Sequence, residues 1–558
     1  MKQFWQAIKK IYQQKQGTLY SSTIAVSLTL LCARLLGIVK LRILTSFYRK
    51  EELDLFFAAF RFPDFIFEVL IAGSIASCFI PLISELTASQ SEKRTIMQFA
   101  QTLSWILLLL WVVLLVITIP FFEKITGMLL PGYSISAVKL VSSMSLLILI
   151  FQVPLLLVAN FAAAIFQTEK QFLIPGLAPI FYNVGIIAGV IGGAHRWGLQ
   201  AAIFGVLIGA ASYLLVLVPG LIILGYPLAV PPTFKDARLK RFFTLFLPRV
   251  FSSLVSQIDA TVDLSLSTLR GMGSYSSFYI AQNFKILPVS FFGIAISQTA
   301  LPFFSDMYNQ GKKERLLQVL VQIIQQVFFV MIPISVFFIV LRIPLIRLFF
   351  GSKKFDWEAT VTTANILSLF ALSLPFHTIY YIITRVYFAL HDTKTPFIAG
   401  VIFTVLNTVL SIVAIVFLHL PVWYLAASFS ISITLNVMVL FYILIRRYDH
   451  VSLPRLTVQL IVFTGIGFIM GVGVWLLRNL LDGLLFNTQR TLDLFFLTST
   501  CILFGYAIYL YLLWIFMPSQ IRYLFELLSR LEFLKVPLSK YRKVIYTNIL
   551  NLPIEEKT

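Results

Sequence analysis

The chain has 558 residues, of which 59% are hydrophobic and only 12% are charged, and its mean hydropathy is +0.90. This composition excludes water-soluble globular folds, which could not cover so much apolar surface, and predicts an integral membrane protein in contact with the lipid bilayer. The formal net charge of +20 would suggest a nucleic-acid partner in a soluble chain. Here the basic residues lie between long apolar runs, so we expect no nucleic-acid partner.

The distribution of basic residues predicts how the chain is oriented. Residues 1–19 are basic and amphipathic, and residues 518–558 alternate apolar with basic side chains. Both patterns are typical of segments that lie along a membrane surface. Lys and Arg also gather near residues 235–241, 312–315 and 446–447, and the positive-inside rule assigns such loops to the cytoplasm. We therefore expect both termini to be cytoplasmic.

Apolar runs that are long enough to cross a bilayer, about 20 residues each, recur along the chain. They predict an all-α membrane protein with about fourteen transmembrane helices, an even count that agrees with two cytoplasmic termini. Several runs contain Pro or Gly, so kinked helices are expected. The predicted spans are 20–48, 54–86, 96–122, 136–167, 172–193, 199–225, 242–269, 275–306, 316–343, 360–390, 396–418, 423–445, 456–480 and 491–517.

A pattern in the second span recurs in the eighth and indicates an internal duplication. Each copy has a Phe and a basic residue before a Pro, then a Gly, then a second Pro followed by a Ser and an acidic residue. The repeat predicts two six-helix lobes, residues 20–230 and 231–450, and residues 451–517 would form two additional helices. Membrane proteins built from such repeats are typically transporters with a site between the lobes. The repeated positions are Pro63, Gly73 and Pro81 in one copy and Pro288, Gly293 and Pro302 in the other.

Ionisable residues inside the predicted spans are the strongest functional signal. Each costs about 2.5–3.5 kcal/mol on insertion scales, so it indicates a water-filled cavity or a charged partner. Arg34 and Lys40 lie in the first span, and Lys285 lies deep in the eighth. Arg61 begins an i, i+3, i+7 stripe with Asp64 and Glu68, which forms either a self-neutralising ladder or a polar wall of a cavity. We predict that these cations face a substrate cavity.

The seventh span carries a polar seam of Ser252, Ser256, Asp259, Asp263 and Ser267, which share one helix face. Two carboxylates one turn apart among hydroxyl groups could bind a small cation or share a proton. The alternative is a seam that only hydrogen-bonds to neighbouring helices.

The sequence lacks the usual signatures of enzymes that act on nucleotides, peptides or esters: a Walker loop, HExxH, GxSxG and a Cys/His cluster. We therefore expect a transporter rather than an enzyme, without a cofactor. Its energy would come from an ion gradient, Na⁺ or H⁺, or from the membrane potential.

Three segments resemble the MurJ (MviN) lipid II flippase family of the multidrug/oligosaccharidyl-lipid/polysaccharide exporter superfamily. They are residues 33–37, with the sequence ARLLG; residues 54–63, which run from Asp54 to Pro63; and residues 387–396, which contain Asp392, Thr395 and Pro396. The resemblance extends over most of residues 20–515.

This resemblance implies two lobes around a cationic cavity that holds the diphosphate and sugars of lipid II, and a groove for the prenyl tail near the last two spans. Arg34 matches a cavity arginine of the family, and Lys40 keeps the charge of another. The family's cation site resembles Asp263 with Asn407, a pair that could hold Na⁺. The resemblance also implies a bacterial cytoplasmic membrane protein, and we expect a monomer.

The chain departs from the family at two cavity arginines, which correspond here to Phe67 and Asn283. Neither side chain can bind phosphate in the bidentate manner of arginine. Flipping of another polyprenyl-diphosphate-linked glycan is therefore an alternative to lipid II. A cation-coupled exporter of amphiphilic small molecules is a second alternative, which would use Asp259 and Asp263 but would not need Arg34 and Lys40.

Overall fold

The computed structural model describes residues 19–69, 78–88, 92–448, 453–482, 485–486, 490–518 and 520–521. The predicted surface segments 1–19 and 518–558 lie almost entirely outside these residues, and so does Gly73 of the predicted repeat. The described chain is nearly all helical and forms two compact units. Unit 1 comprises Met1–Gly311 and Phe349–Arg446, and unit 2 comprises Lys312–Leu348 and Arg447–Thr558.

Ten helices of the described part are long and apolar enough to cross a membrane, and the count rises to eleven if the bent pair α16 (Trp357–Ala371) and α17 (Leu374–Ala389) forms one span. Each of them falls on a predicted span, which confirms a polytopic α-helical membrane protein. The pair α16 and α17 is bent by 50°. The π-helical turns η4 (Ile148–Gln152), η5 (Ser290–Ile294) and η6 (Val413–Phe417) interrupt other spans, and such turns bend a helix locally.

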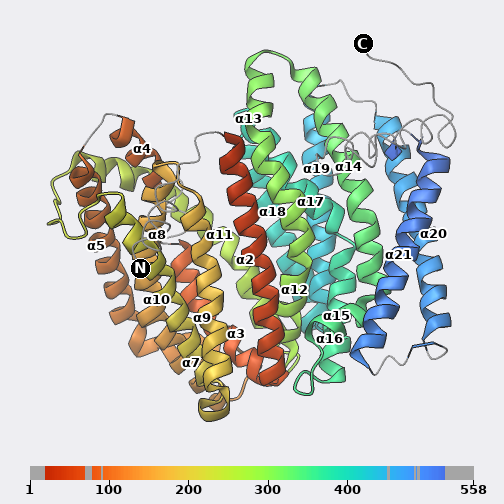
Figure 1. Ribbon diagram of the computed structural model, residues 1–558, viewed down its shortest axis with the longest axis horizontal. Helices are drawn as coiled ribbons and strands as arrows, with labels where there is room; N and C mark the ends of the chain where they lie inside the picture. The colour runs from red at the N-terminus through yellow and green to blue at the C-terminus, as the bar shows by residue number, and fades with distance from the viewer. Residues whose placement is uncertain are drawn as a thin grey trace, which may run out of the picture. The chain divides into compact units, whose positions relative to one another are not determined.

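Unit 1 contains most of the helices (Figure 1). In chain order they are α2 (Leu19–Phe47), α3 (Lys50–Phe67), α4 (Ile80–Ala88), α5 (Lys93–Thr118), η3 (Ile119–Phe121), α6 (Phe122–Leu129), α7 (Ile135–Leu147), η4 (Ile148–Gln152), α8 (Val153–Thr168), α9 (Leu173–Trp197), α10 (Gln200–Ile223), α11 (Ala237–Thr268), α12 (Ser274–Val289), η5 (Ser290–Ile294), α13 (Ala295–Asn309), α16 (Trp357–Ala371), α17 (Leu374–Ala389), α18 (Lys394–Ile412), η6 (Val413–Phe417) and α19 (Tyr424–Tyr448).

Close helix packing in unit 1 depends on small residues. A Cβ atom on Gly185 of α9 would lie 2.4 Å from the backbone of Gly209 in α10, and one on Gly189 would lie 2.3 Å from Gly205. Two such pairs, one turn apart, let the backbones of α9 and α10 touch, which is the usual way that membrane helices associate in the absence of a hydrophobic driving force. α9 also packs against α2 and so positions the charged residues of α2.

The helices that carry the predicted site residues contact one another within unit 1. α3 packs against α7 and α12, α12 packs against α16, and α11 packs against α12 and α18. The charged stretches of the second, seventh and eighth predicted spans are therefore neighbours, although they are up to about two hundred residues apart in the sequence.

Unit 2 is built from α14 (Lys313–Val340), most of α15 (Arg342–Phe350), α20 (Leu453–Leu481) and α21 (Thr491–Phe516). Gly467 of α20 lies directly against the side chain of Ile332 in α14. The hydroxyl of Tyr509 in α21 donates a hydrogen bond to the carbonyl oxygen of Phe329 (3.0 Å). α14, predicted as the ninth span, thus packs with the two helices predicted as an addition to the lobes.

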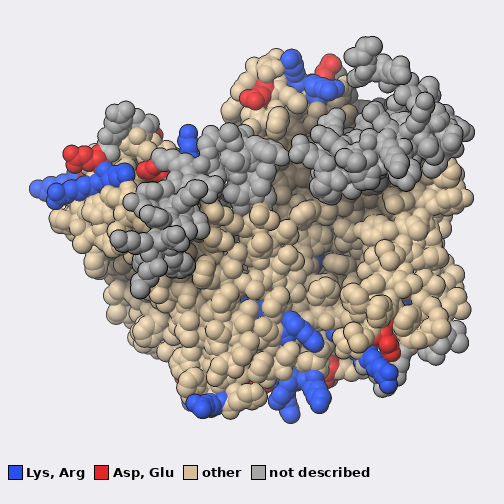
Figure 2. All heavy atoms as spheres, in the orientation of Figure 1, with Lys and Arg blue, Asp and Glu red and all other residues tan. Residues whose placement is uncertain are grey.

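The described surface agrees with a lipid environment. Large apolar side chains are exposed along the helices, including Trp105 and Val116 in unit 1 and Phe468 and Leu503 in unit 2. On the face shown in Figure 2, Lys, Arg, Asp and Glu gather near the ends of the helices, and the surface over their middle parts is nearly free of charge. This is the distribution that a hydrocarbon layer requires.

Candidate substrate and ion sites

Two of the cations of α2, Arg34 and Lys40, are predicted site residues, and we call them the α2 cation pair. The side chain of Arg34 is exposed and that of Lys40 is half-buried. Lys40 interacts electrostatically with Asp64 of α3 and with Arg34, and Arg34 acts on the hydroxyl of Tyr279 in α12. Asp64 is thus an electrostatic neighbour of Lys40 in α2 and of Arg61 in its own helix.

The guanidinium of Arg61 in α3 forms hydrogen bonds to α11 and does not project into a cavity. Its Nη2 donates to the carbonyl oxygen (2.8 Å) and to the side-chain Oε1 (2.7 Å) of Gln257, and its Nε donates to Oγ1 of Thr261 (3.0 Å). The residue is only 9% exposed. It also interacts electrostatically with Asp64 and Asp263. Arg61 thus links α3 to the acidic face of α11, a contact that the stripe on α3 alone did not indicate.

Lys285 of α12 lies in an aromatic cage. Its Nζ is 3.8 Å from the ring centre of Phe370 in α16 and 3.6 Å from that of Phe429 in α19, and the residue is 2% exposed. In this conformation the cage separates the ammonium group from water.

The two carboxylates of the predicted seam lie on α11, next to α18. Nδ2 of Asn407 in α18 donates a hydrogen bond to Oδ1 of Asp259 (2.6 Å), and Asp263 is buried. The predicted partner of Asn407 was Asp263, whereas its direct hydrogen bond is to Asp259. The side chains of Ser252 and Ser256, the first two members of the seam, lie outside the part that the structure describes.

The surroundings of this acid pair offer oxygen ligands. Among the described residues, Oδ1 of Asn407 and the hydroxyl of Ser411, one turn later on α18, are buried and have no hydrogen-bond partner. A cavity of about 440 Å³ lies beside Asn407, and Asp259 and His377 also line it. Carboxylate, amide and hydroxyl oxygens suit a small monovalent cation. No group of three His, Cys, Asp or Glu side chains in the described chain could hold a metal ion.

Asp54, the first residue of the second motif, connects α3 to the start of α12 by hydrogen bonds. We call this contact the Asp54 latch. The carboxylate is fully buried. It accepts hydrogen bonds from the backbone N–H groups of Gly273 (2.6 Å) and Ser276 at the start of α12, and from the hydroxyl of Tyr133 (2.6 Å). A carboxylate at this position satisfies N–H groups that a helix start leaves free, and it interacts favourably with the helix dipole.

The hydroxyl of Tyr133 remains the proton donor in this latch. Tyr133 lies in the loop between α6 and α7. Burial raises the pKa of its hydroxyl well above the usual range, and the nearby Asp54 carboxylate raises the pKa further.

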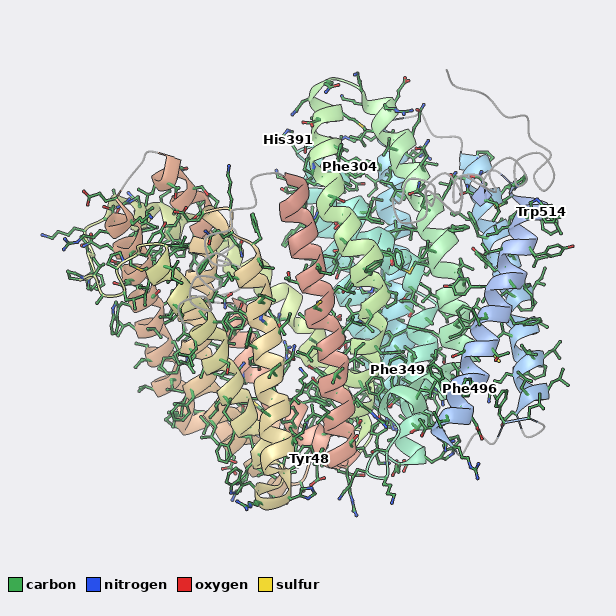
Figure 3. All side chains as sticks on the ribbon, viewed as in Figure 1. Tyr48, Phe304, Phe349, His391, Phe496 and Trp514 are labelled. Atoms are coloured by element: carbon green, nitrogen blue, oxygen red, sulfur yellow. The ribbon has the colours of Figure 1, made fainter. Side chains whose placement is uncertain are left out.

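Further contacts surround the latch at the same end of unit 1. The ammonium group of Lys50, at the start of α3, lies 2.6 Å from a carboxylate oxygen of Glu358 and 3.8 Å from one of Asp356. Tyr48, at the end of α2 (Figure 3), donates from its hydroxyl to the carbonyl oxygen of Gly198 (3.0 Å). Because Glu358 is exposed, this ion pair contributes little by itself.

The third motif forms the turn between α17 and α18, at the other end of unit 1 from Tyr48 (Figure 3). Asp392 accepts hydrogen bonds from the backbone N–H (3.0 Å) and the hydroxyl (2.8 Å) of Thr395. His391 has a φ of 58°, in the left-handed region that a tight turn uses. Pro396 follows in the first turn of α18, where its missing N–H is not needed. The motif therefore shapes a helix start.

The two departures from the family pattern have local roles. Phe67 packs against an apolar core that includes residues of α4, α5 and α8, and Nδ2 of Asn283 donates to the carbonyl oxygen of Tyr279 in its own helix (2.9 Å). Neither side chain supplies a positive charge to the cavity.

Comparison with known proteins identifies the family. Residues 44–495 match the family described as lipid II flippase MurJ, a range that contains the Asp54 latch, the Asp392 turn and the acid pair. The chain belongs to the lipid II flippase MurJ family. The predicted family is thereby confirmed, and with it a transporter rather than an enzyme.

Relatives and solved structures of the family agree over most of the chain. A probable lipid II flippase MurJ of Borreliella burgdorferi is 26% identical over 435 residues, which cover 77% of this chain and 84% of that protein. The lipid II flippase MurJ of Thermosipho africanus is 28% identical, over 70% of this chain and 79% of its own. A solved MurJ structure in an inward closed conformation is 25% identical, with a TM-score of 0.75, and covers 89% of this chain and 100% of its own.

A multidrug resistance MATE family transporter of the MOP superfamily, in an inward-facing conformation, superposes with a TM-score of 0.62 at 15% identity. It covers 74% of this chain and 94% of its own. At this identity the likeness concerns the fold alone, and it confirms a MATE-like arrangement of helices.

Proposed function

We propose that this chain flips lipid II, a polyprenyl-diphosphate-linked cell-wall precursor, across the bacterial cytoplasmic membrane. The observation that carries this proposal is the family match over residues 44–495, to which the curated relatives add the name of their substrate. The positive charge of the α2 cation pair supports it, because a diphosphate is an anion that such a pair would bind.

The proposed topology has about fourteen transmembrane helices, both termini in the cytoplasm and a single copy of the chain. Ten or eleven spans satisfy the length and composition criteria, and α2 and α11, with 29 and 32 residues, are long enough to add two more. The segment 54–86 would add the remaining one. In this arrangement residues 20–230 and 231–450 form the two lobes, and residues 451–517 line the groove for the prenyl tail.

Arg34 and Lys40 would bind the diphosphate. Charge-assisted hydrogen bonds to phosphate are about twice as strong as neutral ones, and Arg34 is exposed enough to make them. Lys40 already interacts electrostatically with Asp64, so it would attract the diphosphate mainly as a nearby positive charge. Arg61 would hold α3 against α11 and shape this wall of the cavity.

Alternating access would require α3 to separate from α12 at the end where the Asp54 latch lies. Two of the three hydrogen bonds to the buried Asp54 carboxylate, those from Gly273 and Ser276, join the two predicted lobes. At the opposite end, the Asp392 turn connects helices of one predicted lobe only. We infer that opening and closing of the latch accompanies each transport cycle.

Energy coupling would use the acid pair on α11. Asp263, Asp259 and Asn407 would hold the coupling ion, Na⁺ or H⁺, and that ion would supply a positive charge that enters and leaves with the transport cycle. The chain's own residues keep the pair in place, because Asn407 orients Asp259 and Arg61 lies near Asp263.

The test of the proposal is complementation of a bacterium depleted of its own lipid II flippase. The wild-type chain should restore growth, whereas Arg34→Ala and Lys40→Ala should each fail although they reach the membrane in normal amounts. The matched control is Arg385→Ala, because this arginine of α17 lies over the ring of Phe388 (5.6 Å) and has no proposed contact with substrate.

The control variant should restore growth like the wild type. Failure of the wild-type chain to restore growth, with normal amounts in the membrane and no flipping of lipid II in proteoliposomes, would contradict the proposed substrate.

A further inference from the structure

The positive charge of Lys285 lies in the interior of unit 1 and needs an explanation. Its side chain is 2% exposed, and two phenylalanine rings cover its ammonium group at 3.8 and 3.6 Å. Cation–π contacts with Phe370 and Phe429 stabilise the charge in part. They do not replace the hydration that a buried ammonium loses, so a carboxylate must contribute.

That contribution comes from α11, which packs against α12. The carboxylates of Asp263 and Asp259 are close enough to act electrostatically on Lys285. They lie four residues apart, one helical turn, and so present their charges on one face. Asp263 also interacts with Arg61. The acid pair therefore has two cations of the chain itself, Lys285 and Arg61, as electrostatic partners.

The same place has ligands for a free cation. Oδ1 of Asn407 and the hydroxyl of Ser411 are 3% and 0% exposed, and among the described residues they have no hydrogen-bond partner. The oxygen ligands for a small monovalent cation are thus present, but the positive charge that such an ion would bring is already supplied by the chain.

We propose that Lys285 is a built-in counter-ion of the acid pair on α11 and that it competes with a free monovalent cation for this site. This inference deepens the coupling role of Asp263 and rests on that part of the proposed function. A covalently attached ammonium is always near the acid pair, whereas Na⁺ must come from solution and meets an unfavourable like charge. The native chain therefore binds Na⁺ weakly here, and Lys285 sets that affinity.

The test is the thermal unfolding of the purified protein in detergent, measured in NaCl and in choline chloride at equal ionic strength. The variant Lys285→Met keeps a long apolar stem for the aromatic cage but removes the charge. It should gain a saturable, Na⁺-specific rise in the unfolding midpoint, which corresponds to an increase of about tenfold or more in Na⁺ affinity. The wild type should show such a rise only at Na⁺ concentrations about tenfold or more higher.

Two further variants separate charge from packing. Lys285→Arg keeps the charge and should behave like the wild type. Adding Asp263→Asn to Lys285→Met should remove the gained response, because the carboxylate that binds Na⁺ is lost. If Lys285→Met does not fold, Lys285→Gln and radioactive sodium binding provide the same comparison.

A neutral variant without a Na⁺ response would overturn the proposal, and so would a wild type that is stabilised by Na⁺ as strongly as the variant. These measurements do not involve lipid II. A chain that gives the expected Na⁺ responses but does not flip lipid II would contradict the proposed function alone.

Discussion

The substitution Asp54→Asn should weaken the contact between α3 and α12 with little change in side-chain volume. The carboxylate accepts hydrogen bonds from two backbone N–H groups, those of Gly273 and Ser276, and from the hydroxyl of Tyr133. An asparagine has one acceptor oxygen, so at least one backbone N–H loses its partner. A hydrogen bond to a charged group contributes about 1.5–3 kcal/mol, which favours the open latch by about 10- to 150-fold.

Hydrogen exchange measured by mass spectrometry checks this directly, because the two amides are themselves part of the latch. Their exchange requires local opening, so its rate should rise by about tenfold or more in Asp54→Asn. The matched control is Asp392→Asn, which removes a carboxylate with a similar capping role at the start of α18. It should accelerate exchange only near Thr395.

Unchanged exchange at residues 273–277 in Asp54→Asn would refute the assignment of this carboxylate as the latch. An equal rise at those residues in Asp392→Asn would also refute it, because the effect would then be a general loss of stability.

Three further outcomes are expected. If a diphosphate is the partner of Arg34, the double variant Arg34→Ala with Asp64→Ala should be as defective in flipping as Arg34→Ala; recovered transport in the double variant would instead indicate a structural pair between these two residues. Asp263→Asn should fold normally but lose any dependence of flipping on Na⁺ or pH in proteoliposomes, and an unchanged dependence would remove the residue from the coupling site. Gly185→Ala should lower the free energy of unfolding by about 1–3 kcal/mol, measured by thermal unfolding, because its Cβ would lie 2.4 Å from the backbone of α10. Gly192→Ala, on the same helix with open space around it, should leave the free energy of unfolding nearly unchanged.

The sequence by itself determined the class of the protein, its family and most of its transmembrane helices. The length of an apolar run and the cost of a charge in hydrocarbon are properties of a short segment, so they can be evaluated without knowing the fold. The turn around Asp392 is likewise determined by a short segment, because the carboxylate of Asp392 binds Thr395 only three residues later. A helix start of this kind is encoded locally.

The partners of the buried charges were decided by the tertiary structure. Asp54 binds N–H groups of α12 that follow it by more than two hundred residues. The hydrogen bonds of Arg61 go to α11, and Asn407 donates to Asp259 rather than to Asp263. The cage around Lys285 combines side chains from three helices. Sequence spacing indicates which residues share a helix face, but the helix that meets this face is selected by packing over the whole unit, so the partner of a buried charge cannot be read from the segment that contains it.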